Sequence, residues 1–349
     1  MQKPLTEIAQ HLTKIILSDM LNTYIFIPMF EEEFRRENIQ KGIHAHRKFL
    51  LELYDYLTIN GDKFDKPKKI AHPFADRVSL LTNYPFLRNM ENVLTAIADL
   101  GEFDDNNTTL TINTNYFRTI MEKTPMAKIA ECIGCLREIG FHITGIDLSN
   151  PVRFFPKETF QMTHTNISSI FIGFKIMTKA KRIYEGKDIY GIFLRCDYRF
   201  IVNEEIDTGM FLKDMMRSLP QENQEYINRM HHKYIAAGFT CKISIVDEMC
   251  LRFFYIIKSK EVWSIIVSAN NGFELAVRAK HTDSYPEIVS SLHPYLQEKI
   301  KKGYGCDKKR NPNSYCQGGC KGYRISLTES LDTLQTDLMI WIDNELLFI

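Results

Sequence analysis

Four consecutive strand-like segments near the C-terminal third constrain the fold of this chain most. They are rich in β-branched and aromatic residues, and short polar breaks separate them. The link Asn270-Asn271-Gly272 is typical of a β-hairpin, because Asn and Gly adopt positive φ angles at little cost. The pattern predicts an antiparallel meander with strands near Cys241–Ile245, Cys250–Lys258, Val262–Ala269 and Phe273–Lys280.

A fifth strand is predicted over Tyr190–Phe200, and two predicted helices separate it from this meander. Its residues alternate between an apolar set and a set that contains Arg195, Asp197 and Arg199. Most other segments show helical spacing. Helices are expected near 8–20, 45–56, 170–183, 210–218, 221–237 and 285–302, a strand at 323–327 and a last helix at 331–346.

The segment from 85 to 156 has a distinct order of elements. A helix ending at Gly101 is followed by a strand at Thr109–Asn113, a short helix capped by Thr114 and a second helix after Pro125. Strands are then expected at 141–146 and 152–155. Helix, strand, helix, helix, strand, strand is the order of a winged helix, so we predict a winged-helix-like module here.

The fold class expected from these patterns is α+β. A length of 349 residues is typical of more than one domain. We expect a helical N-terminal segment at 1–84, the winged-helix-like module at 85–156, and an antiparallel-sheet α+β domain with a Cys/Gly-rich loop at 157–349.

Composition narrows the class of protein. Lys and Arg number 44 against 43 Asp and Glu, so no global charge marks a nucleic-acid or membrane-surface protein. No signal peptide is recognisable, and the apolar runs are far shorter than the roughly 20 residues that cross a bilayer. Eight cysteines are too few for a disulfide scaffold in a chain of this length. We therefore expect a cytoplasmic protein without a membrane partner.

A glycine-rich loop, Gly303–Gly322, carries Cys306, Cys316 and Cys320. Thiolates are ligands that Zn²⁺ prefers, and a C-x3-C spacing with two glycines between can wrap a metal. A fourth ligand is missing locally, and the remaining candidates include Asp307, His281 and His293. Unmetallated thiols and a redox pair remain alternatives to zinc. The cations of the loop favour either a solvated face or an anion site.

Arginines indicate a second candidate site, because a planar guanidinium matches the geometry of a carboxylate. The candidate ligand-binding residues are Arg195, Asp197, Arg199, Arg252, Arg278 and Arg324. An intrasheet ladder of ion pairs is the alternative explanation of the same pattern.

The winged-helix-like module raises the question of DNA binding. The helix after Pro125 is expected to expose Lys128 and Arg137 together with two glutamates. This face has no surplus of positive charge, so contact with phosphates is weakly supported. Cys132-Ile-Gly-Cys135 in the same helix has redox spacing but is expected to be buried.

The leading hypothesis is a non-enzymatic cytoplasmic binding protein that senses a small anionic ligand or holds a structural metal in its C-terminal domain, with a small molecule or a protein as partner. The first alternative is a DNA-binding transcriptional regulator that uses Lys128 and Arg137. The second is an enzyme with a nucleophilic cysteine in the glycine-rich loop. No catalytic residue can be assigned, because no Ser/His/Asp or Cys/His arrangement is visible in the spacing.

Overall fold

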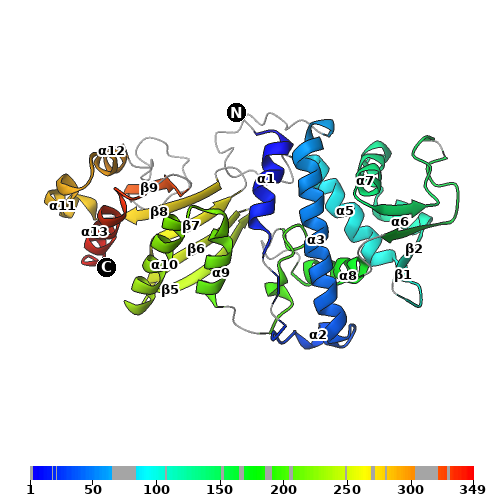
Figure 1. The fold of residues 1–349 in the computed structure, drawn as a ribbon, viewed down its shortest axis with the longest axis horizontal. Helices are drawn as coiled ribbons and strands as arrows, with labels where there is room; N and C mark the ends of the chain where they lie inside the picture. Colours follow the sequence, from blue (N-terminus) through cyan, green and yellow to red (C-terminus); the bar gives the residue numbers. More distant parts are fainter. Residues whose placement is uncertain are drawn as a thin grey trace. The chain divides into compact units, whose positions relative to one another are not determined.

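The chain folds into two compact units. The computed structural model describes residues 3–17, 19–20, 22–64, 84–106, 108–150, 153–164, 169–184, 191–203, 207–247, 250–268, 272–279, 281–302, 321–327 and 331–349. Unit 1 comprises Met1–Glu205 with Asp247–Met249, and unit 2 comprises Ile206–Val246 with Cys250–Ile349 (Figure 1). The helices and strands of the described residues mix in both units, which confirms the predicted α+β class.

Unit 1 is mainly helical. Its helices are α1 (Leu5–Ile15), α2 (Pro28–Glu31), α3 (Arg36–Asn60), α5 (Pro85–Leu100), α6 (Thr114–Ile120), α7 (Met126–Glu138) and α8 (Ile170–Ile183), with 3-10 turns at Gly61–Lys63 and Tyr198–Phe200. The helix expected at 45–56 is therefore the second half of a longer one, α3. Its first turns are rich in charged residues, which hid their helical periodicity.

Two glycines allow α3 and α8 to approach closely. A Cβ atom added to Gly173 would lie 2.2 Å from the carbonyl oxygen of Gly42, and one added to Gly42 would lie 2.9 Å from the backbone nitrogen of Gly173. Only glycine leaves room for two backbones at this separation. The crossing brings His46 of α3 against the rings of Phe49, Phe174 and Phe193, in an apolar core.

The predicted strand at 190–200 is wrong. In the structure, residues 191–203 form a buried series of turns, which we call the strap. Its carbonyl groups are satisfied by α3: His46 Nε2 lies 2.8 Å from the oxygen of Phe193, and the hydroxyl of Tyr54 donates to the oxygen of Leu194 at 2.6 Å. Gly191 and Cys196 have positive φ angles of 78° and 52°, which interrupt an extended backbone.

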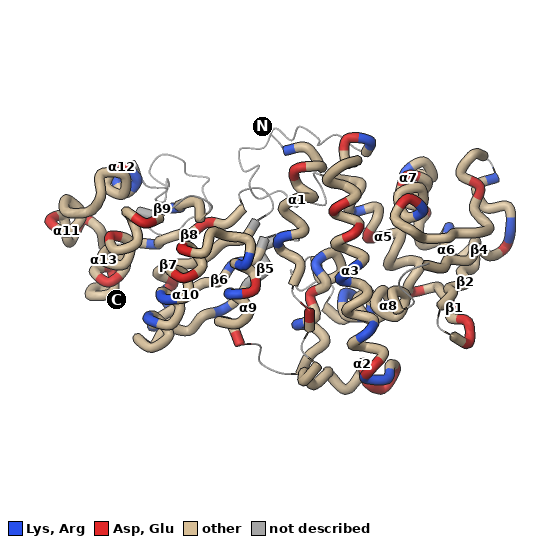
Figure 2. Tube along the Cα trace, viewed as in Figure 1, with Lys and Arg blue, Asp and Glu red and all other residues tan. Residues whose placement is uncertain are grey.

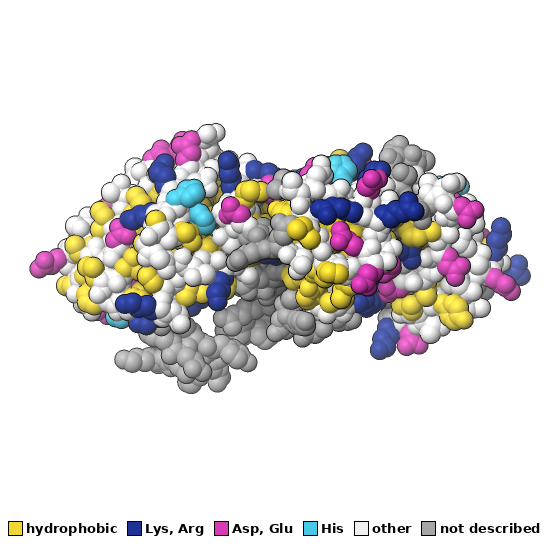
Figure 3. Space-filling model, turned by 90° about the horizontal axis from the view of Figure 1, so that it is seen from below, with side chains coloured by type: hydrophobic (Ala, Val, Ile, Leu, Met, Phe, Trp, Pro, Cys, Tyr) yellow, Lys and Arg dark blue, Asp and Glu magenta, His cyan; other side chains and the backbone are white. Residues whose placement is uncertain are grey.

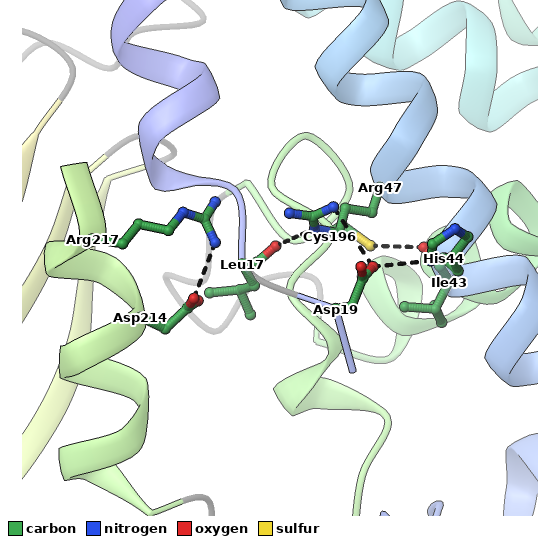
Figure 4. A network of polar contacts seen from close by, with 8 residues as sticks. All are labelled: Leu17, Asp19, Ile43, His44, Arg47, Cys196, Asp214 and Arg217. Carbon is green, nitrogen blue, oxygen red and sulfur yellow. Dashed lines mark hydrogen bonds and ion pairs between the residues drawn. The ribbon is translucent and has the colours of Figure 1, made fainter. Parts of the chain in front are cut away.

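A second set of polar contacts holds the residues that follow α1 against α3 (Figure 4). Arg47 Nε donates to the carbonyl of Leu17 at 2.7 Å, and Asp19 pairs with His44 at 3.0 Å. The thiol of Cys196 lies 3.5 Å from the carbonyl oxygen of Ile43, so the strap also contacts α3 at this point. Figure 4 also draws an ion pair of unit 2, between Asp214 and Arg217 at 3.0 Å.

The sheet of unit 1 has the order β1-β2-β4-β3, and its paired strands are antiparallel. The strands are β1 (Glu102–Phe103), β2 (Thr109–Asn113), β3 (Phe141–Thr144) and β4 (Thr159–His164). The expected strand at 152–155 is wrong, because the strand that pairs with β2 and β3 is β4. Asn113, rather than Thr114, caps α6 by accepting from the backbone nitrogens of Asn115 and Tyr116. The winged-helix interpretation stays a prediction.

Unit 2 contains one five-stranded sheet in the order β5-β6-β7-β8-β9, in which β6 to β9 pair antiparallel. Its strands are β5 (Thr240–Asp247), β6 (Cys250–Ile257), β7 (Lys260–Ser268), β8 (Gly272–Ala279) and β9 (Lys321–Ser326). The predicted meander is present, and Gly272 has the positive φ expected of the hairpin, 71°. The helices are α9 (Thr208–Met215), α10 (Gln221–Ala236), α11 (Pro286–Ser291), α12 (Pro294–Lys302) and α13 (Gln335–Leu346), with 3-10 turns at Met216–Ser218 and Thr282–Ser284.

Helices cover one face of this sheet. Phe211 of α9 lies 5.8 Å from Phe253 of β6, and Tyr234 of α10 lies 5.5 Å from Trp263 of β7, between ring centroids. Figure 1 shows α9 and α10 lying across the strands. Tyr255 and Trp263 stack at 3.6 Å on the same face, so this face forms the core of unit 2. None of the helices in the described part of the chain has the length and apolarity that a membrane crossing requires.

The buried His46 gives unit 1 a pH-dependent stability. Burial lowers the pKa of His46 from 6.5 to about 4, although the bond to the Phe193 carbonyl works in the opposite direction. The unfolded chain therefore binds a proton that the folded chain rejects. The stabilisation is complete above pH 6.5 and is lost as the pH falls toward 4, by up to about 3 kcal/mol.

We expect His46→Gln to flatten the pH dependence of unit 1 stability between pH 6.5 and pH 4, measured by hydrogen exchange of α3 amides. His142→Gln is the matched control, because His142 is exposed on β3 of the same unit. An unchanged pH profile in the His46 variant would show that this histidine is not the titrating group.

Candidate functional site

The predicted ligand residues Arg195, Asp197 and Arg199 lie in the strap, not on an exposed strand face. The side chains of Arg195 and Asp197 are each 1% exposed. Arg199 donates to both carboxylate oxygens of Asp197, at 2.7 and 2.6 Å, and Arg195 donates to the same carboxylate at 3.2 Å. The three residues thus form a closed internal cluster.

Electrostatics agrees with this structural role. Burial pushes the pKa of Asp197 upward, but the guanidinium groups of Arg199 and Arg195 outweigh it and hold the pKa below its ordinary value. Removing one member would leave a buried charge without its counter-charge, which is strongly destabilising. We conclude that this cluster holds the strap together and presents no open ligand face.

The other predicted ligand residues, Arg252, Arg278 and Arg324, belong to unit 2. They stand on β6, β8 and β9, and the register places their positions on one face of the sheet. This is the face opposite Tyr255 and Trp263, because side chains alternate along each strand. We call it the charged face. Among the described residues it includes Arg252, Phe254, Glu261, Ser264, Ile266, Glu274, Ala276, Arg278 and Arg324.

A β-bulge brings Glu261 onto the charged face. The register shifts at Tyr255/Ile256, so that Tyr255 opposes Trp263 while Ile256 opposes Glu261. Strict alternation would put Glu261 on the side of Trp263. The extra residue in β7 reverses the direction of its side chain. Bulges are known to re-aim a side chain in this way.

The carboxylate of Glu261 is shared by two arginines. It forms an ion pair with Arg252 and a second one with Arg278 Nε at 3.1 Å. The side chains of Arg252 and Glu261 are only 19% and 20% exposed. Their pairing is therefore less screened by water than that of a surface salt bridge. Arg252 Nε also lies 3.2 Å from the hydroxyl of Ser264.

The remaining pair on the charged face is looser. Arg324 lies 3.7 Å from Glu274, and its side chain is 46% exposed. The ion pairs printed for the charged face thus join Arg252, Arg278 and Arg324 to Glu261 and Glu274. Among the described residues the face carries a ladder of ion pairs.

The centre of the charged face is built from small residues. Phe254 opposes Ser264, Ser264 opposes Ala276, and Ala276 opposes Arg324, which gives one row across four strands. Ser264 and Ala276 are 0% and 1% exposed, so the centre of the row is shielded from solvent. Phe254 and Arg252 are also close, with the guanidinium carbon 5.8 Å from the ring centroid.

The predicted metal ligands Cys306, Cys316 and Cys320, and the loop that carries them, lie outside the described residues. In the parts of the chain that the structure does describe, no group of three or more His, Cys, Asp or Glu side chains is arranged to hold a metal ion. The zinc hypothesis stays a prediction, and elemental analysis of the purified protein tests it.

Cys132 and Cys135, the pair with redox spacing, are buried free thiols on α7. Burial raises the pKa of Cys135 to about 12, and burial raises the pKa of Cys241 in unit 2 to about 11. A thiol must ionise to act as a nucleophile, so these two are inert at neutral pH.

The predicted DNA-contacting residues are engaged within the protein. Lys128 pairs with Glu131 at 3.0 Å, one helical turn away. Arg137 donates to the carbonyl oxygens of Ile143 and Ile146 at 2.9 and 3.0 Å, which ties α7 to the end of β3. Within α7 the exposed residues are Ala127 and Glu138. Lys128 and Glu131 are partly exposed, at 30% and 35%, whereas Arg137 is held against β3, so contact of this pair with DNA stays a prediction.

Sequence patterns identified three arginines of the charged face but missed Phe254, Ser264 and Glu261. Alternation along β6 places Phe254 beside Arg252, and this signal was available. The bulge that turns Glu261 toward the arginines has no comparable signal, because it depends on the pairing of two strands.

Comparison of the chain with protein-family models, with curated proteins and with solved structures finds no match.

Proposed function

We propose that this chain is a non-enzymatic cytoplasmic binding protein that holds a small anionic ligand on the charged face of unit 2. The observation that supports this is the grouping of arginines on one face of the sheet: Arg252 and Arg278 share the carboxylate of Glu261, and Arg324, whose side chain is 46% exposed, pairs with Glu274.

Arg324 is the residue that first meets the ligand. It is the most exposed of the three arginines, and its ion pair is the longest. A guanidinium group has five N–H donors, so Arg324 can hold Glu274 and a ligand carboxylate together. Bidentate pairing with a carboxylate is stronger and more directional than a single contact.

Charges of both signs are interspersed over the described parts of the chain, which is compatible with a local site. Figure 2 shows Lys and Arg interspersed with Asp and Glu along the traces of both units, and the side chains on the surface of Figure 3 are similarly mixed. With 44 basic and 43 acidic residues, long-range attraction of polyanions is not expected. A small anion held by short-range contacts fits this distribution better.

We predict that small carboxylates stabilise the protein and that Arg324→Gln abolishes the effect. A ligand that binds only the folded state raises the melting temperature, by an amount that grows with its concentration over Kd. Thermal shift with a panel of anions measures this. Trp263 and Trp341, the two tryptophans of the chain, both lie buried in unit 2, so their fluorescence reports the relevant unit.

Arg35→Gln is the matched control, because Arg35 is an exposed arginine of unit 1. It should respond to each anion as the original protein does. Stabilisation that persists in Arg324→Gln, or stabilisation by no anion of the panel, would contradict the proposal.

A second candidate function is DNA binding by residues 85–164. It is supported by the element order α5, β2, α6, α7, β3, β4 and by the position of β4 between β2 and β3. Figure 2 shows charges of both signs on α7, which disfavours that helix as the contact. The exposed cations Arg118 of α6 and Lys123, in the turn before α7, are better candidates.

For this candidate we predict weak, salt-dependent binding to duplex DNA, measured by fluorescence anisotropy. Each phosphate contact contributes about 0.9 to the slope of log K against log salt concentration, so Arg118→Gln with Lys123→Gln should lower the slope by about 1.8. The control, Arg35→Gln, should leave the slope unchanged. No binding at low salt would eliminate this function.

A further inference from the structure

His231 of α10 lies where two helices and the sheet of unit 2 meet. It is 7% exposed, and its Nδ1 atom is 2.8 Å from the hydroxyl oxygen of Tyr255 on β6. The other ring nitrogen, Nε2, faces Gly209 in the first turn of α9. We propose that His231 is an acid-sensitive contact, which holds α9 against the sheet of unit 2 at neutral pH and releases it when the imidazole ring gains a proton.

The glycine at position 209 allows a close contact between His231 and α9. A Cβ atom added to Gly209 would lie 2.8 Å from Nε2 of His231 and 3.2 Å from Oδ1 of Asp207. Asp207 caps this turn, because its Oδ1 accepts from the backbone nitrogens of Gly209 at 2.8 Å and Met210 at 3.3 Å. The N-terminus of a helix carries a partial positive charge, so a protonated imidazole is unfavourable here, whereas a neutral one is tolerated.

The titratable groups near the ring come from each element packed against it. Among the described residues they are Asp207 at the start of α9, His232 on α10, Tyr255 on β6, and Cys241 on β5, whose thiol is hydrogen-bonded to Tyr255. Burial and the charge of His232 lower the pKa of His231 from its ordinary 6.5, and Asp207 opposes this only in part. Burial raises the pKa of Cys241 to about 11 and also raises the pKa of Tyr255, so both groups stay neutral in acid.

The closed arrangement therefore favours the neutral form of His231. Once α9 separates from the sheet, water reaches the ring and its pKa returns toward 6.5, so the opened form binds a proton more readily than the closed form. Opening is independent of pH above 6.5 and becomes more favourable as the pH falls below that value. One proton linked to the opening changes its equilibrium constant by up to about tenfold per pH unit.

α9 is the element expected to open. It has 8 residues, whereas α10 has 16, and it buries Phe211, Leu212 and Met215. A short helix has little stability of its own, so its position depends on its packing contacts. Release of α9 would uncover Phe253 of β6, whose ring centroid lies 5.8 Å from that of Phe211. This event is separate from anion binding, because α9 covers the face of the sheet opposite the charged face.

The test is hydrogen exchange of the full chain, followed by mass spectrometry between about pH 7.5 and about pH 5 and corrected for the intrinsic effect of pH on exchange. Protection of the α9 amides should be constant above pH 6.5 and should fall below it, by up to about tenfold per pH unit. Protection of the β7 amides, at the centre of the same sheet, should stay constant. His231→Gln should remove the pH dependence of α9, because an amide side chain does not titrate.

His232→Gln is the matched control, because His232 is the exposed neighbour on the same helix. It should keep the pH dependence and move it to higher pH, since the change removes a charge that lowers the pKa of His231. Gly209→Ala tests the contact itself. Alanine favours a helix over glycine, so a loss of α9 protection at pH 7.5 in this variant comes from the clash with His231.

Protection of α9 that does not change with pH in the original protein overturns the inference, and so does a pH dependence that survives in His231→Gln. An equal fall of protection in α9 and β7 overturns it as well, because that result reports unfolding of the whole unit. Should His231→Gln not fold, the comparison of α9 with β7 and the shift in His232→Gln decide.

Discussion

The charged face of unit 2 depends on the two ion pairs that Arg252 and Arg278 form with the carboxylate of Glu261. One face of the sheet packs against α9 and α10 and forms the core, and the opposite face carries five charged side chains. Partly buried arginines side by side would repel each other, and the bulge in β7 places a carboxylate between them. Arg324 lies outside this shared carboxylate and is the most exposed of the three arginines, which is why we propose it as the residue that meets a ligand.

In unit 1, side chains of α3 donate to buried backbone carbonyls. The strap runs through the interior, where each unpaired carbonyl would cost free energy, and the side chains of His46 and Tyr54 supply the missing donors. The cluster of Asp197 with two arginines is closed in the same way. Both units thus bury charged and polar groups in networks of paired side chains, but among the networks described here only that of unit 2 lies on a sheet face with a partly exposed arginine.

The sequence predicted the elements whose periodicity is long and unambiguous. The strands β5 to β8, the helices α7 and α8 and the strand β2 were expected close to their observed bounds. The strap was mistaken for a strand, because its alternating residues resemble a half-buried strand. Its true partners on α3 lie 140 and 147 residues away in the chain, beyond any local pattern. The candidate site could be predicted only in part. The residue types of the sequence identify its arginines, but strand register and the bulge determine which other side chains lie beside them, and neither is a local pattern.

The central claim is that the charged face of unit 2 binds a carboxylate through its arginines. It is tested most directly by NMR of the arginine Nε–H groups during titration with benzoate. The account predicts that the signals of Arg324 and Arg278 shift in a saturable manner, while the signal of exposed Arg35 in unit 1 stays in place. Saturable shifts confined to arginines outside the sheet, or no shift of any arginine signal, would contradict it.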